Sequence, residues 1–341
     1  MTSSKSRIPK SIVTALTATA VAAGLIGAVD DAPSAAASPE AGADRDYVSL
    51  VNPWIEADIG RFFFFQSASN PFGMVKLRPD TTTHHARNTG YRKNEDEVKG
   101  FSHLHDWQLS GVQVMPTSGE PTPKLEGDTG WESHVEHDDS ELAQPGYHRL
   151  HLDRYDIDAE LTTTDRVGMH RYTYGQDGAG EIIVNLGGVL GEAEMEDAHV
   201  TRVSDHELAG YVNQHGERYP GRHETTLYFN IQFDTAFDAM HGWADGALID
   251  DGGAVDEVEG PDAGVYVSYD DLEAGDEVQM KVALSLTGED GARRNLEAEA
   301  PGWDFEAVKS ASQNRWNEML GRIDVAGGTD EQQQKFYTDL F

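Results

Sequence analysis

The sequence lacks cysteine entirely: none of its 341 residues carries a thiol. Disulfide bonds, thiolate metal sites, a cysteine nucleophile and lipid-modified cysteines are therefore excluded for this chain. If the protein is exported, its stability has to come from the hydrophobic core, because covalent cross-links are not available to it.

Basic residues are also scarce, with 26 Lys and Arg against 60 Asp and Glu, which gives a formal net charge of −34. We expect no nucleic-acid partner, because affinity for phosphate backbones needs clustered Lys and Arg. The acidic residues are spread along the chain, so we expect the negative charge to favour solubility. The alternative is adaptation to high salt, where screening reduces the repulsion between like charges.

The motifs of several large enzyme classes are absent as well. The sequence has no G-x-S-x-G, no P-loop and no G-x-G-x-x-G followed by a helix, which argues against the corresponding hydrolases, nucleotidases and dinucleotide-binding enzymes. Catalytic carboxylate pairs cannot be recognised either, because among 60 acidic residues any spacing occurs by chance. No catalytic residue is therefore assigned from the sequence.

The N-terminus has the layout of a secretory signal peptide. Basic residues precede an uncharged, mostly apolar run at 12–29, and an A-x-A-like cleavage site follows at 35–37. We predict a signal peptide over residues 1–37, a disordered linker over 38–46, and a secreted, extracellular protein that is not in the membrane after cleavage. The alternatives are a membrane anchor or association with the cell surface, although the apolar run is rich in Ala, Thr and Gly.

From residue 47 to 288 the pattern is that of a mainly β domain. Short runs of β-branched and aromatic residues alternate with turn residues, and several show the period-two alternation of a half-buried strand. No helical stretch interrupts them, which argues against βαβ units and predicts a large antiparallel β-sandwich. The clearest predicted strands are residues 73–77, 147–152, 181–186, 226–233 and 264–269.

Linker helices and a short strand are predicted over residues 289–328. Apolar residues recur at helical spacing over 304–320, and Asp304 is the expected N-cap. Residues 321–325 then resemble a short strand.

Residues 329–341 are predicted to be the start of a helical domain. Thr329 is a suitable N-cap, and acidic residues follow it in the first turn. This helix has no stop signal, and a chain that ends inside an amphipathic helix with its apolar face uncovered is expected to be truncated relative to a longer protein.

The densest group of polar and aromatic residues lies at 100–111. Sugar-binding sites combine an aromatic face with side chains that grip hydroxyl groups, and Trp107 can supply such a face. The same residues could equally be structural, because buried histidines are often satisfied by backbone groups and a tryptophan often belongs to the core. The polar candidates around Trp107 are Arg87, His103, His105, Asp106 and Gln108.

A metal site in the same stretch is an alternative. His103, His105 and Asp106 offer two imidazoles and a carboxylate, which Zn²⁺ could use. Residues two apart on a strand share a face and often only line a pocket, and no second group of ligands is evident. We therefore predict no metal site formed by this chain.

Several segments together resemble glycoside hydrolase family 92, the exo-acting α-mannosidases. They stand in the family's order, cover residues 47–341, and form a specific signal only in combination. These segments are residues 51–55 (VNPWI), 70–81 (NPFGMVKLRPDT), 90–91 (GY), 100–105 (GFSHLH), 114–117 (VMPT), 185–188 (NLGG), 228–233 (YFNIQF) and 336–338 (FYT).

The resemblance implies a galactose-mutarotase-like supersandwich that is joined by linker helices to an α/α toroid, with the active site between them. It implies inverting hydrolysis by an acid and a base, assisted by Ca²⁺, with these residues and most calcium ligands in the helical domain, outside this chain. By position, it implies that the β-sandwich contributes sugar-binding side chains. The substrate-binding residues predicted in this way are Trp107, His103, His105, Asp106, Arg87 and Tyr91.

Two departures from the family pattern put the linkage specificity in doubt. Many members have a glycine-rich stretch where this chain has residues 56–62 (EADIGRF). Many also continue with a Thr-His-Leu-Ser-Gly-like sequence where this chain has residues 104–108 (LHDWQ).

The resulting hypothesis is a secreted α-mannosidase that acts on α-mannose-containing glycans, in N-glycan degradation, and of which this chain is the carbohydrate-facing part. Alone, the chain is expected to be inactive, because the missing C-terminal catalytic domain of the same polypeptide is its necessary partner. One alternative is a stand-alone carbohydrate-binding β-sandwich, and another is an adhesive surface protein with a vestigial pocket. Loss of sugar binding on Trp107→Ala would argue against the last of these.

Overall fold

A computed structural model describes the chain from residue 45 onward, with six internal gaps and one single-residue gap. The predicted signal peptide and residues 38–44 of the predicted linker lie outside the described residues. The described ranges are 45–58, 65–82, 90–105, 111–119, 130–138, 140–187, 193–216 and 223–341.

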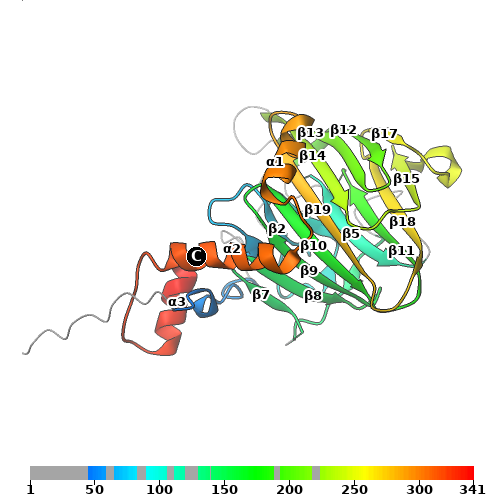
Figure 1. Cartoon of the computed structure of the whole chain (residues 1–341). Helices are drawn as coiled ribbons and strands as arrows, with labels where there is room; N and C mark the ends of the chain where they lie inside the picture. Colours follow the sequence, from blue (N-terminus) through cyan, green and yellow to red (C-terminus); the bar gives the residue numbers. More distant parts are fainter. Residues whose placement is uncertain are drawn as a thin grey trace, which may run out of the picture. The chain divides into compact units, whose positions relative to one another are not determined.

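Two large antiparallel sheets form the body of the protein (Figure 1). In spatial order, the eight-stranded sheet consists of β1 (Ala68–Ser69), β2 (Lys76–Pro79), β4 (Phe101–Ser102), β5 (Gln113–Ser118), β11 (Gly178–Asn185), β18 (Gly264–Leu272), β15 (Ala239–Ala244) and β16 (Ala247–Leu248). The nine-stranded sheet consists of β17 (Glu257–Gly260), β12 (Ala193–Ser204), β13 (Glu207–Gly216), β14 (His223–Phe233), β19 (Glu277–Ser285), β10 (Val167–Tyr174), β9 (Ile157–Thr163), β8 (Tyr147–Leu152) and β7 (Leu142–Gln144). A small third sheet pairs β3 (Glu97–Val98) with β6 (Ser133–His134). The predicted mainly β fold is confirmed.

The main core lies between the two large sheets. Strand β10 shows how the sequence produces it, because Tyr172 and Tyr174 point into this core while Met169 packs under a helix on the outer face. The alternation follows from the two-residue repeat of a strand. Each apolar side chain that is fully buried in this way contributes about 1.5–3 kcal/mol.

Two helices cover the outer face of the nine-stranded sheet (Figure 1). Helix α1 (Glu289–Glu299) packs against β19 and β14, and α2 (Phe305–Leu320) packs against β9, β10 and β8. Between them, Lys281 of β19 is buried, donates from Nζ to the Ala300 carbonyl at 3.0 Å, and lies 3.8 Å from the Trp303 ring centroid. Burial lowers the pKa of Lys281 to about 8.

The first described residues tie the helical end of the chain together. Tyr47 and Val48 lie at the start of the short 3₁₀ helix η1 (Val48–Leu50). They pack with Trp316 of α2 and with Tyr337 of α3 (Asp330–Leu340). The backbone N–H of Val48 donates to Asn317 Oδ1 at 2.9 Å. The N-terminal segment and helices α2 and α3 therefore form one packed unit, although almost 300 residues separate them in sequence.

The predicted helix starts agree with the structure, and one predicted strand is wrong. Asp304 caps α2 by accepting from the Ala307 N–H at 2.9 Å, and Thr329 forms a capping box with Gln332. Residues 321–325, predicted as a strand, form a turn instead. The Tyr337 hydroxyl holds this turn, because it donates to the Ile323 carbonyl and accepts from the Val325 N–H.

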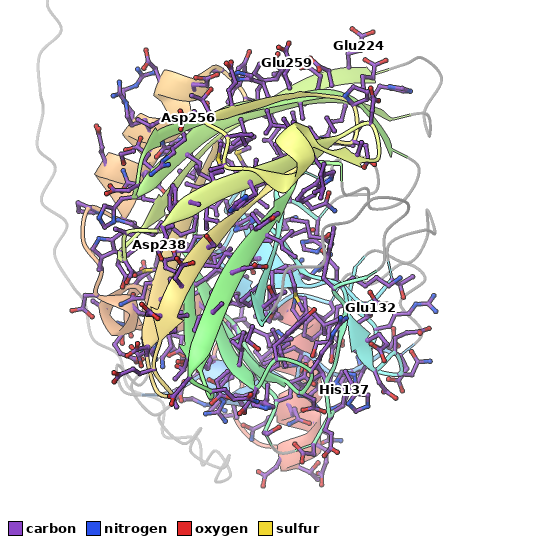
Figure 2. All side chains as sticks on the ribbon, turned by 90° about the vertical axis from the view of Figure 1, so that its right-hand side faces the viewer. Glu132, His137, Glu224, Asp238, Asp256 and Glu259 are labelled. Atoms are coloured by element: carbon purple, nitrogen blue, oxygen red, sulfur yellow. The ribbon has the colours of Figure 1, made fainter. Side chains whose placement is uncertain are left out.

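Many acidic residues lie on the outside of the sandwich. Figure 2 shows Glu224, Asp238, Asp256 and Glu259 on strands and turns of different sheets, and all four are exposed. None of the helices in the described part of the chain is long and apolar enough to cross a membrane. The predicted domain boundaries at residues 47, 289 and 329 stay predictions.

Candidate functional site

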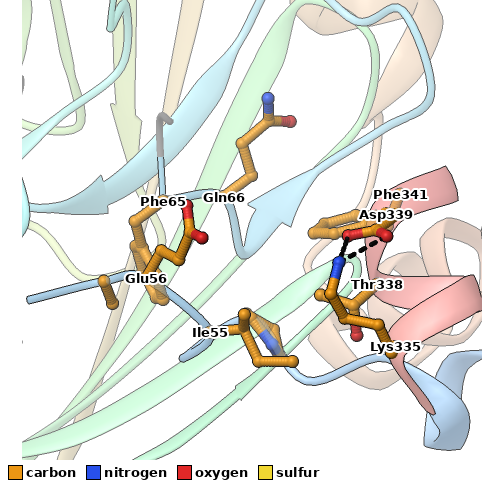
Figure 3. Close-up of a pocket in the computed structure, with 10 residues that line it drawn as sticks. Ile55, Glu56, Phe65, Gln66, Lys335, Thr338, Asp339 and Phe341 are labelled. Carbon is orange, nitrogen blue, oxygen red and sulfur yellow. Dashed lines mark hydrogen bonds and ion pairs between the residues drawn. The ribbon is translucent and has the colours of Figure 1, made fainter. Parts of the chain in front are cut away.

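A cavity of about 510 Å³ lies between the N-terminal segment and α3 (Figure 3). One wall comes from residues 53–57 and 65–66, and the opposite wall comes from the C-terminal half of α3. The lining residues are Pro53, Ile55, Glu56, Ala57, Phe65, Gln66, Lys335, Thr338, Asp339 and Phe341. The size is within the usual range for small-molecule sites, roughly 300–1,000 Å³.

The lining combines aromatic faces with groups that bind hydroxyls. Phe65 and Phe341 offer rings, and Glu56 and Gln66 offer a carboxylate and an amide. Lys335 and Asp339 form an ion pair on the α3 wall. Sugars need this combination, because their C–H faces pack on rings while their hydroxyls both donate and accept.

Behind the cavity, Phe65 belongs to a cluster of aromatic rings. Its ring centroid lies 4.2 Å from that of Tyr91 and 5.2 Å from that of Trp54, and both pairs are stacked. Lys93 Nζ lies 4.1 Å from the Trp54 ring centroid. Tyr91, one of the predicted substrate-binding residues, is itself buried, so it supports the wall through Phe65 and does not line the cavity.

The hydroxyl of Tyr91 belongs to a buried hydrogen-bond network around Glu141. This carboxylate accepts from Tyr91 at 3.0 Å and contacts His137 Nδ1 at 2.6 Å and His148 Nε2 at 3.0 Å. Burial alone would raise the pKa of Glu141, but hydrogen bonds from the two histidines outweigh it and lower the pKa to about 2. The same contact raises the pKa of His137, whose side chain is labelled in Figure 2.

His103, another predicted sugar-binding residue, lies inside the sandwich with both ring nitrogens occupied. Its Nδ1 donates to the Val112 carbonyl at 2.8 Å, and its Nε2 lies 2.7 Å from Nε2 of His170 on β10. The Tyr172 hydroxyl contacts the other nitrogen of His170 at 2.8 Å. Burial lowers the pKa of His103 to about 4 and that of His170 well below its usual value, so both rings are neutral.

His105 is also buried, in a second polar group around Asp80. Its Nε2 lies 2.6 Å from Asp80 Oδ1, and its Nδ1 donates to the Lys76 carbonyl at 2.7 Å. The other oxygen of Asp80 accepts from Gln113 Nε2 at 2.7 Å and from the Ser102 hydroxyl. Burial, with the Arg78 guanidinium, lowers the pKa of His105.

A glycine links this group to Tyr91. Gly90 has φ = +79°, and a Cβ at this position would lie 2.7 Å from Cδ2 of His105. Only glycine allows the chain to pass so close to the imidazole with this backbone conformation. The structure therefore brings His105 near the chain segment of Tyr91, whereas Trp107, Asp106 and Arg87 lie outside the described residues. The sugar-binding role of all six stays a prediction.

Comparison with known proteins identifies the family. The model of the glycosyl hydrolase family 92 N-terminal domain matches residues 50–285, more than half of the chain. This chain belongs to glycosyl hydrolase family 92. The model of the family 92 catalytic domain matches residues 291–341, which hold α2, α3 and most of α1. The resemblance drawn from the sequence motifs is confirmed.

Relatives of known structure have the same fold. A family 92 α-mannosidase from Bacteroides thetaiotaomicron is 27% identical with a TM-score of 0.77, and the match covers 87% of this chain and 40% of that one. An inverting family 92 mannosidase from the same organism, 19% identical with a TM-score of 0.71, shows the fold alone; the match covers 86% of this chain and 39% of that one.

One curated relative comes from Arthroderma benhamiae and is described as an uncharacterized secreted glycosidase. It is 27% identical over 307 residues, a match that covers 81% of this chain and 39% of the relative. The chain therefore spans about 40% of the length of the family 92 proteins that it matches.

Several residues of these networks were not singled out from the sequence. Glu141 could not be distinguished among 60 acidic residues, His148 shares the predicted strand 147–152 with His151, and His170 lies outside the strands named from the sequence. Asp80 is the second-last residue of the family-like segment 70–81, and membership of that segment was the sequence signal that could have identified it. What makes these residues special is the tertiary contact between strands, which spacing along the chain does not encode.

Glu141→Gln is expected to lower the free energy of unfolding of this family 92 chain by about 2 kcal/mol at pH 7. An amide nitrogen would face one of the two histidine N–H groups, so a buried donor would lose its acceptor. Urea unfolding followed by tryptophan fluorescence measures the change. Glu136→Gln, at an exposed position in the same loop, is the control, and an equal effect of both substitutions would contradict the role of the network.

Proposed function

We propose that this chain is the N-terminal part of a secreted α-mannosidase and that its cavity forms one wall of the mannose-binding site. The observation that carries the proposal is the position of the cavity. It lies where the family's N-terminal domain, through residues 53–57 and 65–66, meets α3, which falls within the catalytic-domain match. A relative with 27% identity is an α-mannosidase, and its structure is also known in complex with mannoimidazole.

In this proposal the chain's own residues bind and orient the sugar. The rings of Phe65 and Phe341 pack against C–H groups, while Glu56 and Gln66 accept from and donate to hydroxyls. Buried Tyr91 keeps the Phe65 ring in place. Inverting hydrolysis needs a protonated acid and a carboxylate base on opposite faces of the sugar ring, and we assign neither group to this chain.

Calcium is part of the proposal through the family resemblance alone. Among the residues that the structure describes, no three His, Asp or Glu side chains come together in a group that could hold a metal ion. The described part of the chain thus does not fit a complete calcium site, and no step is derived through the ion. When bound in a longer polypeptide, calcium would supply a hard Lewis acid for sugar hydroxyls.

The test compares this chain with a polypeptide extended by the coding sequence that follows codon 341. We expect release of mannose from an α-mannoside by the extended polypeptide, its loss on addition of EDTA and its recovery with Ca²⁺, and no turnover by residues 1–341. Full-length protein that is folded but inert on all α-mannosides would contradict the proposal. Mannose binding by the shorter chain without any hydrolysis by the longer one would favour the alternative, a carbohydrate-binding β-sandwich.

A further inference from the structure

Part of the nine-stranded sheet presents polar and aromatic side chains on its outer face. In β12, β13 and β14, residues such as Ala198, Val212 and Leu227 are buried in the main core. The residues next to them point to the opposite face, because successive side chains of a strand alternate, and they are only partly buried. Helix α1 covers β14 and β19 at one side of this outer face, and β13, β12 and β17 follow beyond them in the sheet (Figure 1).

Three rings form an aromatic row across this face: His199, Tyr211 and Tyr228. His199 of β12 pairs with Tyr211 of β13, which in turn pairs with Tyr228 of β14. The ring centroids of His199 and Tyr211 are 5.6 Å apart, and those of Tyr211 and Tyr228 are 6.3 Å apart. Cross-strand ring pairs stabilise a sheet, but these three side chains are also partly exposed, so they can contact a ligand as well.

A polar row made of Asp197, Asn213 and Thr226 crosses the same three strands beside the rings. The Tyr211 hydroxyl donates to Asp197 Oδ2 at 3.4 Å, and the Thr226 hydroxyl donates to Asn213 Oδ1 at 2.7 Å. The polar row lines a groove of about 290 Å³, together with Glu196, Gln214, Glu224 and Thr225. The aromatic row and the groove therefore form one continuous surface.

The charge and polarity of this surface decide which ligands fit it. Three carboxylates line the groove, and none of the described residues that line it is basic. Glu224 of the groove and Glu259, opposite His199, both point outward (Figure 2). An anionic ligand is therefore disfavoured. A protein partner is disfavoured too, because the centre of a protein interface is rich in apolar side chains, and the described lining of the groove has no large one.

The groups on this surface match the hydroxyls of a sugar. Carboxylates accept from hydroxyls, amides both donate and accept, and rings pack on C–H groups. Partial burial and the carboxylates of Asp197 and Glu259 raise the pKa of Tyr211, so its hydroxyl keeps its proton at neutral pH. The carboxylates are not a metal site, because no three His, Asp or Glu side chains in the described ranges form a group that could hold an ion.

We propose that the aromatic row and the polar row together bind a neutral oligosaccharide, at a second sugar site on the outer face of the sheet. This site shares no lining residue with the cavity beside α3. Both rows cross three neighbouring strands, so they suit a chain of sugars better than a single one. The inference goes beyond the proposed function, because it concerns a binding surface that takes no part in hydrolysis.

Native gel electrophoresis of the protein through gels that contain a polysaccharide tests this site, because binding retards the protein. The probes are three neutral polysaccharides, namely α-mannan, galactomannan and starch, and one anionic polysaccharide, polygalacturonate. We expect retardation by at least one neutral probe and none by the anionic probe. Tyr211→Ala removes a ring face and Asp197→Ala removes a hydroxyl acceptor, and each should raise the dissociation constant about tenfold.

Two control variants separate the outer face from other surfaces. Gln66→Ala changes the cavity beside α3, and Phe72→Ala removes a ring that is 93% exposed elsewhere on the chain. Both should be retarded like the wild type. The melting temperature of each variant distinguishes lost binding from unfolding. If Tyr211→Ala does not fold, Asp197→Ala still decides the question, because it removes one negative charge from an acidic surface and should leave the melting temperature unchanged.

Three results would overturn the proposal. The first is that none of the neutral polysaccharides retards the wild type. The second is that a folded Tyr211→Ala or Asp197→Ala variant is retarded as much as the wild type, or that the two controls lose as much retardation as the face variants. The third is retardation by poly-L-lysine but by no polysaccharide, which would indicate a basic polypeptide as the occupant of the acidic groove.

Discussion

Replacing His170 with alanine is expected to lower the free energy of unfolding by about 3–4 kcal/mol at pH 7.5. The side chain is fully buried between the sheets and joins His103 Nε2 to the Tyr172 hydroxyl. Its removal leaves a cavity and leaves two buried polar groups without a partner, and both effects destabilise. The His103–His170 contact also connects β10 of one sheet to the residue that follows β4 in the other, so its loss weakens the packing of the two sheets.

Urea unfolding of the wild type and variant measures this effect. His151→Ala is the control, because His151 lies on β8 of the same sheet with its side chain partly in water and paired with Asp158; we expect a change within about 0.5 kcal/mol there. A loss below 1 kcal/mol for His170→Ala would show that the buried pair contributes little to the joining of the sheets. In a double-mutant cycle with His103→Ala, the two changes in the free energy of unfolding should be strongly non-additive, because the two rings share one hydrogen bond.

Acid is expected to destabilise the protein well above the pH at which carboxylates titrate. Burial lowers the pKa of His103 to about 4 and that of His170 well below 6.5, whereas both titrate near 6.5 in the unfolded chain. The unfolded chain therefore binds more protons than the folded chain between about pH 4 and 6.5, and stability is lost as the pH falls through this window. For His103 alone, the difference corresponds to about 3 kcal/mol.

Two other groups affect the pH profile in different ways. The pKa of His137 is raised by Glu141, so its contribution is complete at acidic pH and is lost as the pH rises above 6.5. The pKa of Glu141 is lowered to about 2, so its contribution is present above about 4.5 and disappears at lower pH than the histidine window. Burial also lowers the pKa of His105, which acts in the same direction, so the loss below pH 6.5 is assigned to the three buried histidines His103, His105 and His170.

Urea unfolding at intervals from pH 7.5 to 4.5 checks this profile, and an NMR titration of the histidine ring protons checks its cause. The signals of His103 should titrate near pH 4, and those of His170 well below pH 6.5. A His170→Gln variant should show a shallower loss of stability over the same window. Titration of the buried pair near 6.5 would contradict the expected mechanism.

From the sequence, His103 and His105 could have either a structural or a sugar-binding role, and the structure shows which hydrogen bonds they form. Both imidazoles contact backbone carbonyls and buried partners from other parts of the chain, so in this structure they organise the interior of the sandwich. The cavity beside α3 instead uses Phe65 and Gln66.

Much of the fold could be predicted because its signals are local. Strand β8 occupies residues 147–152 as predicted from alternation, and the caps Asp304 and Thr329 start their helices as predicted from side-chain chemistry. Residues 321–325 were mistaken for a strand because apolar alternation over five residues does not reveal a missing partner. The Tyr337 hydroxyl, from the next helix, decided that turn.

By itself, the sequence determined the family, the mainly β architecture, the helices at the C-terminal end and the absence of thiol chemistry, since each of these depends on residue type and on short-range periodicity. Only the tertiary structure decided which side chains meet: the pairing of His103 with His170, the two histidines on Glu141, and the cavity that α3 forms with residues 53–57 and 65–66. The reason is physical. His103 and His170 are 67 residues apart, and the walls of the cavity are hundreds of residues apart, while the two histidines that are near Glu141 in sequence meet its carboxylate only in the folded chain. The energies of these contacts depend on burial and geometry, and neither is set before the two sheets close over the core.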